Sequence, residues 1–387
     1  MRVLALYDQE AWPALNGTAR RFSAIAEGLA SDFDLTICLF PTVADAAATP
    51  TTENVVRVPR SRSRVGAAAG MVARAGRWPL HTAFYARRPV RRQVASLIER
   101  TQPDVVFVHG IAGAAVVAGA FDPGHVVLDL DNAEHVRFAT MASSTSSLRA
   151  WQYRLDVGLI RSWMGRTLSS YGAVLLTSTE DVAAVREVAP GAKLDVLPNG
   201  SDPQEPRPDP GGAQVLFLGD LGYAPNADGL NWFRTEVLPL IPVEQRPVVR
   251  VVGKGSAPAG DDIVAVGTAP DLNTEWQRVV AMIAPIRSGA GTRLKVLDAF
   301  AAGVPVVGTS LGVGGIGVQD GTHALVADDA PSFADAVTRL LRDRALRDHL
   351  SAEANKLVRE QYAWSSITSQ LARIIRSVAA EKHTQPL

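Results

Sequence analysis

The residues of this chain with the clearest chemical potential lie between positions 288 and 298. The stretch reads Ser-Gly-Ala-Gly-Thr-Arg-Leu-Lys-Val-Leu-Asp. Gly289, Ala290 and Gly291 let backbone N–H groups approach an anion closely. Thr292 can then cap a helix that begins beside Arg293. Because the free N–H groups and the macrodipole at a helix start attract negative charge, we predict a phosphate site here.

Lys295 and Asp298 follow at a spacing of three, so on a helix both side chains fall on one face. A cation near a phosphate and a carboxylate one turn deeper suit a nucleotide, with Lys295 on phosphate and Asp298 on ribose hydroxyls. The sequence leaves one alternative open, a surface ion pair between the two side chains on an ordinary helix.

The length and the charge of the chain limit its class. Its 387 residues are too many for one typical core and predict two domains or three. The 39 basic and 39 acidic residues balance, so we expect no nucleic-acid partner. Cys38 is the only cysteine, which excludes an internal disulfide and predicts a core residue in a reducing compartment.

No segment has the sequence of a membrane anchor or a signal peptide. The apolar start is too short for a signal peptide, so we expect a cytoplasmic protein. The longest nearly apolar stretch, residues 105–121, contains His109 and is shorter than the about 20 residues that span a bilayer. It predicts a buried strand followed by a buried helix.

One segment breaks the overall charge balance. Residues 54–98 contain no acidic residue, and ten arginines lie between Arg57 and Arg92. Such a stretch, interleaved with aromatic residues, is attracted to anionic lipid and predicts peripheral contact with the inner face of a membrane. A solvated basic face and a cleft rim that attracts an anionic substrate are equally good interpretations.

Short β-branched runs alternate with helical segments along the chain, a pattern typical of parallel sheets buried on both faces. Residues 201–213 hold four prolines and no periodic apolar residues, and predict a linker. We therefore predict an α/β protein with Rossmann-like domains at residues 1–200 and 214–364, and a last helix, residues 365–387, that packs on the first domain. The expected strands are residues 3–7, 34–40, 55–58, 105–108, 126–130, 173–177 and 194–197, then 215–218, 248–252, 263–266, 279–284, 304–307 and 324–326.

Several of these segments together resemble glycosyltransferase family 4. The resemblance is strong in the second half and rests on residues 197–202, 215–229, 251–255, 288–307 and 362–364. In the first half it rests on the Asn16-Gly17 loop, the strand layout and residues 128–132. The resemblance implies the GT-B fold, two doubly wound domains facing a central cleft, and transfer of a sugar from a nucleotide donor with retention of configuration.

The resemblance also assigns residues to a donor site. It implies that Gly17 and Thr18 face the donor phosphates, that Gly291 and Thr292 offer backbone donors to the pyrophosphate, and that Asp298 binds ribose. The strand that ends at Gly219 is expected beside the donor, with Arg287 as a further candidate.

The chain departs from the family pattern at two places on the donor side. The usual pair of glutamates eight residues apart falls at Ala290 and Asp298, so the first carboxylate is missing. The usual basic pair after Gly219 is replaced by Asp220 and residues 223–226. Arg293 and Lys295 are then the candidates that stabilise the leaving diphosphate.

A third departure lies in the first domain. Many members place a histidine after the strand equivalent to residues 126–130, where this chain has Asp131 and Asn132. Asp131 could orient a sugar hydroxyl or accept a proton, or it could equally cap the next helix with Glu134. His109, at the end of the preceding strand, is a weaker candidate.

The sequence thus predicts a retaining glycosyltransferase that moves a hexose-type sugar from a nucleoside diphosphate to a hydroxyl acceptor, a lipid-linked or polysaccharide precursor. We expect no cofactor and no metal, since the one Asp-x-Asp spacing, residues 129–131, lies in the wrong domain for the diphosphate. The alternatives are a nucleotide-sugar epimerase of the same fold and a non-catalytic nucleotide-sugar-binding or assembly subunit.

Overall fold

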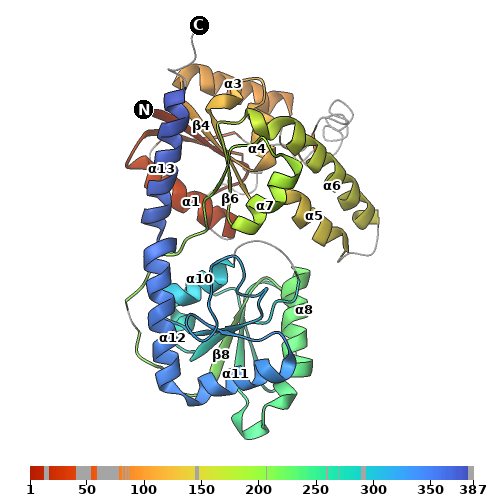
Figure 1. Cartoon of the computed structure of the whole chain (residues 1–387), viewed down its shortest axis with the longest axis vertical. Helices are drawn as coiled ribbons and strands as arrows, with labels where there is room; N and C mark the ends of the chain where they lie inside the picture. The colour runs from red at the N-terminus through yellow and green to blue at the C-terminus, as the bar shows by residue number, and fades with distance from the viewer. Residues whose placement is uncertain are drawn as a thin grey trace. The chain divides into compact units, whose positions relative to one another are not determined.

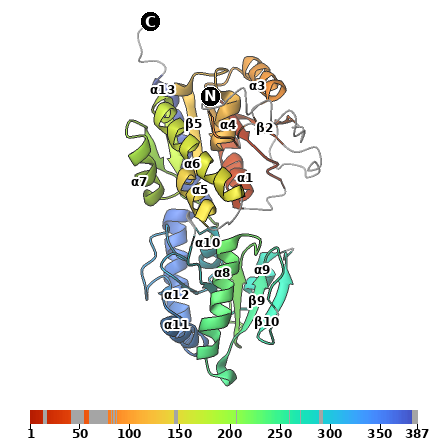
Figure 2. The same cartoon turned by 90° about the vertical axis from the view of Figure 1, so that its right-hand side faces the viewer.

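A computed structural model of the chain divides into two compact units (Figures 1 and 2). The first unit comprises Met1–Pro198 with Trp364–Leu387, and the second comprises Asn199–Ala363. The structure describes residues 1–12, 17–40, 54–58, 78–80, 82, 85, 87–143, 148–205, 207–258, 260–269, 271–288 and 293–381.

The first unit contains a seven-stranded sheet in the order β3-β2-β1-β4-β5-β6-β7, and every neighbouring pair is parallel. All seven predicted strands are confirmed, each with one end shifted by one residue. The strands are β1 (Arg2–Tyr7), β2 (Asp34–Leu39), β3 (Val55–Arg57), β4 (Val105–His109), β5 (Val126–Asp131), β6 (Ala173–Leu176) and β7 (Leu194–Val196).

Side chains alternate along these strands and supply two separate cores. In β1, Leu4 and Leu6 belong to one core, and Ala5 and Tyr7 belong to the other, which also holds residues of α1 and α13. The apolar stretch 105–121 is a buried strand and a buried helix, as predicted. The helices are α1 (Gly17–Ala30), α3 (Arg88–Thr101), α4 (Gly110–Val117), α5 (Glu134–Ser143), α6 (Leu148–Thr167), α7 (Thr179–Val188) and α13 (Trp364–Glu381).

The last helix, α13, lies against α1 in the first unit (Figure 1). The two helices approach closely at Gly28, where a Cβ would lie 2.4 Å from Cγ2 of Thr368. A glycine is therefore required at this contact, and the C-terminal helix packs on the first unit although the second unit precedes it in the chain.

A buried ion pair joins α1 to the middle of the sheet. Arg21 Nε and Nη2 donate to the two carboxylate oxygens of Asp129 at 2.9 and 3.0 Å, and both side chains are completely buried. The guanidinium also donates to the carbonyls of Leu197 and Pro198, each at 2.9 Å. One arginine thus connects α1, β5 and the segment after β7.

The second unit repeats the plan with six parallel strands in the order β10-β9-β8-β11-β12-β13. Both sheets are doubly wound, as predicted, because the strand order reverses between β1 and β4 in the first unit and between β8 and β11 in the second. The strands are β8 (Gln214–Leu218), β9 (Val248–Val252), β10 (Ile263–Gly267), β11 (Ala281–Ala284), β12 (Val306–Gly308) and β13 (Leu325–Val326). The helices include α8 (Ala224–Trp232), α9 (Leu272–Trp276), α10 (Leu294–Ala301), α11 (Ala330–Arg342) and α12 (Arg344–Leu357).

The predicted linker, residues 201–213, needs correction, because its first part is bonded to the second unit. The Ser201 N–H donates to the Tyr362 carbonyl, and the Arg207 guanidinium donates to the carbonyls of Gly303 and Trp276. Prolines exclude this segment from helix and sheet, and its polar side chains attach it to the surface instead. We call residues 201–205 and 207–209 the strap.

In the described part of the chain, no helix is long and apolar enough to cross a bilayer.

We expect Arg21→Met to destabilise the protein by about 3 to 5 kcal/mol, because it leaves the buried carboxylate of Asp129 without its cation. Urea unfolding followed by circular dichroism measures this change. Lys193→Met is the matched control, since Lys193 forms an exposed pair with Glu381 in the same unit and its loss should cost about 0 to 1 kcal/mol. Equal losses in the two variants would contradict the importance of the buried pair.

Candidate functional site

Lys295 lies in the first turn of α10 but extends back to the carboxyl end of β8. Its Nζ donates to the carbonyl of Leu218 at 3.1 Å and to Oδ1 of Asn226 at 2.8 Å. It also lies 5.4 Å from the ring centroid of Phe217. Lys295 therefore forms no ion pair with Asp298, and the alternative of a surface pair on an ordinary helix is wrong.

The environment of Lys295 favours its neutral form. Loss of hydration lowers the pKa of the Lys295 amine to about 7, and the nearby positive charge of Arg293 acts in the same direction. An anion placed beside the amine has the opposite effect, because it stabilises the ammonium. Binding of an anion and protonation of Lys295 are consequently coupled.

Gly219 follows β8 directly and lies beside Asn226, the partner of Lys295, in a closely packed turn. A Cβ on Gly219 would lie 2.8 Å from Cγ of Asn226, and a Cβ on Gly253 would lie 2.0 Å from the carbonyl oxygen of Gly219. The structure thus brings the predicted residues Gly219 and Lys295 together. It also shows why position 219 is glycine, which is a matter of packing.

Asn226 is the site residue that the sequence analysis missed. It lies in the first turn of α8, is 9% exposed, and contacts both Lys295 and the main chain of Asp220. The available signal was its position, since residues 223–226 stand where the resemblance expects a basic pair. A neutral amide gave no reason to connect it with a lysine 69 positions later.

The other predicted donor-side residues have separate partners. Asp298 is buried and accepts a hydrogen bond from Ser201 Oγ at 3.0 Å, which ties α10 to the strap. Arg293 is the N-cap of α10 and donates through Nε to the Leu311 carbonyl at 3.1 Å. The exposed Arg287 pairs with an aspartate on α8, and its guanidinium lies 5.3 Å from the ring centroid of Trp232.

The predicted phosphate loop itself is not part of the described structure. Ala290, Gly291 and Thr292 lie outside the described residues, so their contacts and the capping role of Thr292 stay predictions. The helix begins at Leu294, one residue after the expected position, and its N-cap has no side-chain hydrogen bond to the helix.

In the first unit, Asp131 and His109 lie at the carboxyl ends of the adjacent strands β5 and β4. Asp131 has a φ of 65°, which is uncommon for a residue with a side chain. Burial raises the pKa of the Asp131 carboxyl, the charges of Asp129 and Glu134 add to the shift, and Arg21 and His109 oppose it. A raised pKa at a sheet edge is typical of a functional carboxyl.

The capping alternative for Asp131 finds no support among the described residues, where its side chain makes no hydrogen bond to α5. Asp181 Oδ1 accepts the Ala133 N–H at 2.8 Å instead. In the part of the chain that the structure describes, His109 Nε2 and the Tyr7 hydroxyl are buried and have no hydrogen-bond partner, and the two rings meet edge-on at 5.2 Å. Tyr7 is a second residue that the sequence analysis missed.

The remaining first-unit candidates are less informative. Gly17 and Thr18 are the first residues of α1, and the Asn132 N–H donates to the Leu130 carbonyl. Asn16 lies outside the described residues.

Comparison with known proteins identifies the second unit. Residues 212–343 match the family model described as glycosyl transferases group 1. A group 1 glycosyltransferase domain forms this unit. The resemblance predicted from the sequence is thereby confirmed.

Relatives of this glycosyltransferase domain match only part of their own length. A phosphatidyl-myo-inositol mannosyltransferase from Mycobacterium leprae is 36% identical over 98 residues, which are 25% of this chain and 26% of that protein. The chain spans less than half of the length of the curated relatives that it matches.

Solved structures extend the comparison to the whole chain. Sucrose-phosphate synthase from Thermosynechococcus elongatus superposes with a TM-score of 0.72 at 14% identity, over 98% of this chain and 99% of that chain. HepE from Anabaena, solved in complex with UDP and glucose, superposes with a TM-score of 0.66 at 15% identity, over 97% and 100%. The chain has the GT-B fold that was predicted.

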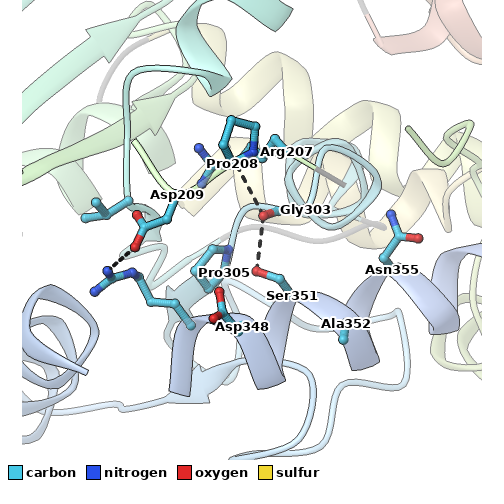
Figure 3. A pocket seen from close by; sticks show the side chains of 11 residues that line it. Arg207, Pro208, Asp209, Gly303, Pro305, Asp348, Ser351, Ala352 and Asn355 are labelled. Atoms are coloured by element: carbon cyan, nitrogen blue, oxygen red, sulfur yellow. Dashed lines mark hydrogen bonds and ion pairs between the residues drawn. The ribbon is translucent and has the colours of Figure 1, made fainter. Parts of the chain in front are cut away.

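Within the glycosyltransferase domain, a pocket of about 300 Å³ lies under the strap (Figure 3). It contains none of the predicted site residues. Its polar groups hold the strap in place: Arg207 and Ser351 both donate to the Gly303 carbonyl, and Arg347 pairs with Asp209. We interpret this pocket as a structural feature.

The Asp-x-Asp spacing at residues 129–131 does not form a pair of free carboxylates, because Asp129 is bound to Arg21. Within the described ranges, no group of three or more histidine, cysteine, aspartate or glutamate side chains could hold a metal ion.

We expect the Lys295 amine to titrate near pH 7, about three pH units below an exposed lysine. NMR titration of the lysine side chains measures this directly, and Lys295→Arg assigns the signal by removing it. The chain has five lysines, and the ordinary pKa of a lysine side chain, about 10.4, is the reference value. A Lys295 midpoint at the reference value would show that the amine is hydrated.

Proposed function

We propose that this protein is a retaining glycosyltransferase that moves a hexose-type sugar from a nucleoside diphosphate to a hydroxyl acceptor. The observation that carries the proposal is the Lys295 amine, held by two acceptors at the carboxyl end of β8 in a group 1 glycosyltransferase domain. Ligands of open α/β sheets bind at this end of the strands. HepE, which shares the fold, was solved with UDP and with UDP-glucose.

Breaking a glycosidic bond to a diphosphate requires stabilisation of the charge that develops on the leaving group. In the proposed site, Lys295 and Arg293 supply positive charge, and the residues before α10 supply backbone N–H groups. We propose that Asp298 binds the ribose and that no metal or other cofactor is needed.

On the acceptor side, we propose that Asp131 binds a sugar hydroxyl or takes its proton. Burial raises the pKa of this carboxyl, which favours its taking a proton from an acceptor hydroxyl. Nε2 of the neighbouring His109 has no hydrogen-bond partner among the described residues. The acceptor is proposed to be a lipid-linked or polysaccharide precursor. The Mycobacterium leprae relative, named for a phosphatidyl-myo-inositol acceptor, supports this class.

A thermal-shift panel with UDP, GDP, ADP and dTDP tests the donor site. One nucleotide at about 100 times its dissociation constant should stabilise the wild type by roughly 2.7 kcal/mol, and Lys295→Ala should lose the shift. The shift should be equal in EDTA and in Mn²⁺. Between pH 7 and 9 the affinity should fall by up to about tenfold per pH unit as Lys295 loses its proton, and Lys295→Arg should remove this dependence.

The same experiment distinguishes the rival functions when turnover is added. Slow hydrolysis of the nucleotide sugar, absent in Lys295→Ala, supports the transferase. Binding with no turnover on any acceptor supports the non-catalytic subunit, and no shift with any nucleotide contradicts the donor site. A strict need for manganese contradicts the metal-free proposal.

We also propose peripheral contact of the basic stretch with an anionic membrane. Most of that stretch lies outside the described residues, but Arg88 and Arg92 on α3 are exposed. Arg57 pairs with Glu10, and Arg91 donates to the Ala118 carbonyl, so these two have internal roles.

The wild type should sediment with phosphatidylglycerol vesicles at low salt and much less at about 1 M salt, where the Debye length is about 3 Å. Arg88→Glu combined with Arg92→Glu should weaken this binding. Arg342→Glu, an exposed change on α11 of the second unit, is the control. No sedimentation of the wild type at low salt would remove the support for membrane contact.

A further inference from the structure

The ammonium of Lys295 has three N–H groups, and the fold binds two of them. One points to the carbonyl of Leu218 and one to Oδ1 of Asn226. The main-chain acceptor, the Leu218 carbonyl, is present whatever side chain the residue carries. The second acceptor exists only because residue 226 is asparagine.

We infer that Asn226 is a positioning residue that orients the Lys295 ammonium so that its third N–H is directed to the diphosphate of a nucleotide. The inference rests on the proposed donor site and adds to it a residue for which neither the resemblance nor the relatives supplied a role.

The orientation of the Asn226 amide follows from its second contact. Its Nδ2 donates to the carbonyl of Asp220 at 2.9 Å, so Oδ1 is the atom that faces Lys295. Gly219 lies against the flat face of the amide, where a Cβ would be only 2.8 Å away. The amide is therefore held on both sides and cannot turn without losing a hydrogen bond.

The neutrality of Asn226 matters for the charge of the site. The acids near this turn are engaged elsewhere: the Asp220 carboxylate accepts the Gly222 N–H at 2.7 Å, and Asp228 pairs with Arg287 at 3.3 Å. Asp298 binds Ser201, and Arg293 is the charged group that acts on Lys295. An amide oxygen thus positions the ammonium without neutralising it, and the positive charge stays available to an anion.

The same position explains how the chain can lack the basic pair that the resemblance expects after Gly219. With that pair absent, Lys295 and Arg293 supply the positive charge, and the Lys295 ammonium contributes most when it is fixed, because a mobile side chain loses conformational entropy on each binding event. Asn226 stands within the segment that replaces the pair, and it supplies that fixation.

Asn226→Asp tests the inference with almost no change of shape. The new carboxylate should pair with Lys295, so the Lys295 titration midpoint should rise well above 7. UDP, or the nucleotide that the panel selects, should bind roughly ten- to a hundredfold more weakly at pH 7.5, because the site loses a net positive charge. The pH dependence of binding between 7 and 9 should become flat.

Asn226→Ala removes the acceptor without adding charge. Binding should weaken about tenfold and keep its pH dependence, and the Lys295 midpoint should not rise. Asn231→Asp is the matched control, since Asn231 is an exposed asparagine on the same helix, and it should bind nucleotide as the wild type does. Thermal unfolding verifies that each variant is folded. If the alanine variant does not fold, the test rests on Asn226→Asp alone.

Failure of the inference and failure of the proposed function are distinguishable. If the wild type binds nucleotide and both Asn226 variants match it in affinity and pH profile, Asn226 has no positioning role. If the wild type binds none of the four nucleotides, the proposed donor site fails and the inference fails with it. A purely structural Asn226 would lower the thermal stability of the alanine variant but leave its nucleotide affinity unchanged, which also overturns the inference.

Discussion

The partial removal of the Lys295 ammonium from water constrains the entire polar edge of the second unit. A cation in this position is costly unless its N–H groups find acceptors, and the fold supplies a strand-end carbonyl and an amide oxygen. The Asn226 amide can reach Lys295 only if position 219 is glycine, because a Cβ there would clash with the amide. Position 253 must also be glycine, because a Cβ there would clash with the Gly219 carbonyl. The glycines after β8 and β9 thus follow from the placement of one lysine.

The first unit solves the problem of a buried charge differently. Arg21 and Asp129 neutralise each other completely, and the remaining guanidinium N–H groups bind the main chain after β7. That pair holds the scaffold rigid, whereas at the carboxyl ends of β1 and β4 the Tyr7 hydroxyl and His109 Nε2 have no hydrogen-bond partner among the described residues. Buried polar groups in folded proteins are almost always satisfied, so two unsatisfied atoms on contacting rings at one sheet edge indicate a place for a polar ligand.

The fold was largely predictable from the sequence, because a strand buried on both faces is a continuous apolar run and needs no distant information. The site was predictable only in part. Lys295 was found from its spacing, but its direction depends on Leu218 and Asn226, which lie at least 69 residues earlier. The sequence predicts a linker where the structure has the strap, because prolines indicate only that a segment is neither helix nor sheet. The hydrogen bonds of Arg207 arise from tertiary contact.

The use of a buried lysine beside Arg293, in place of the expected basic pair, changes how the site responds to its ligand. Two permanent charges would attract a diphosphate equally over a wide range of pH. An amine with a pKa of about 7 is only partly protonated at neutral pH, and an anion beside it raises the protonated fraction, so proton uptake accompanies binding. Before the anion arrives, a neutral amine lowers the cost of burying Lys295 beside Arg293. After it arrives, the same amine provides the charge that a leaving diphosphate requires. A neutral asparagine is compatible with both the neutral and the protonated form of Lys295. An aspartate at position 226 would hold Lys295 in the protonated form even without an anion.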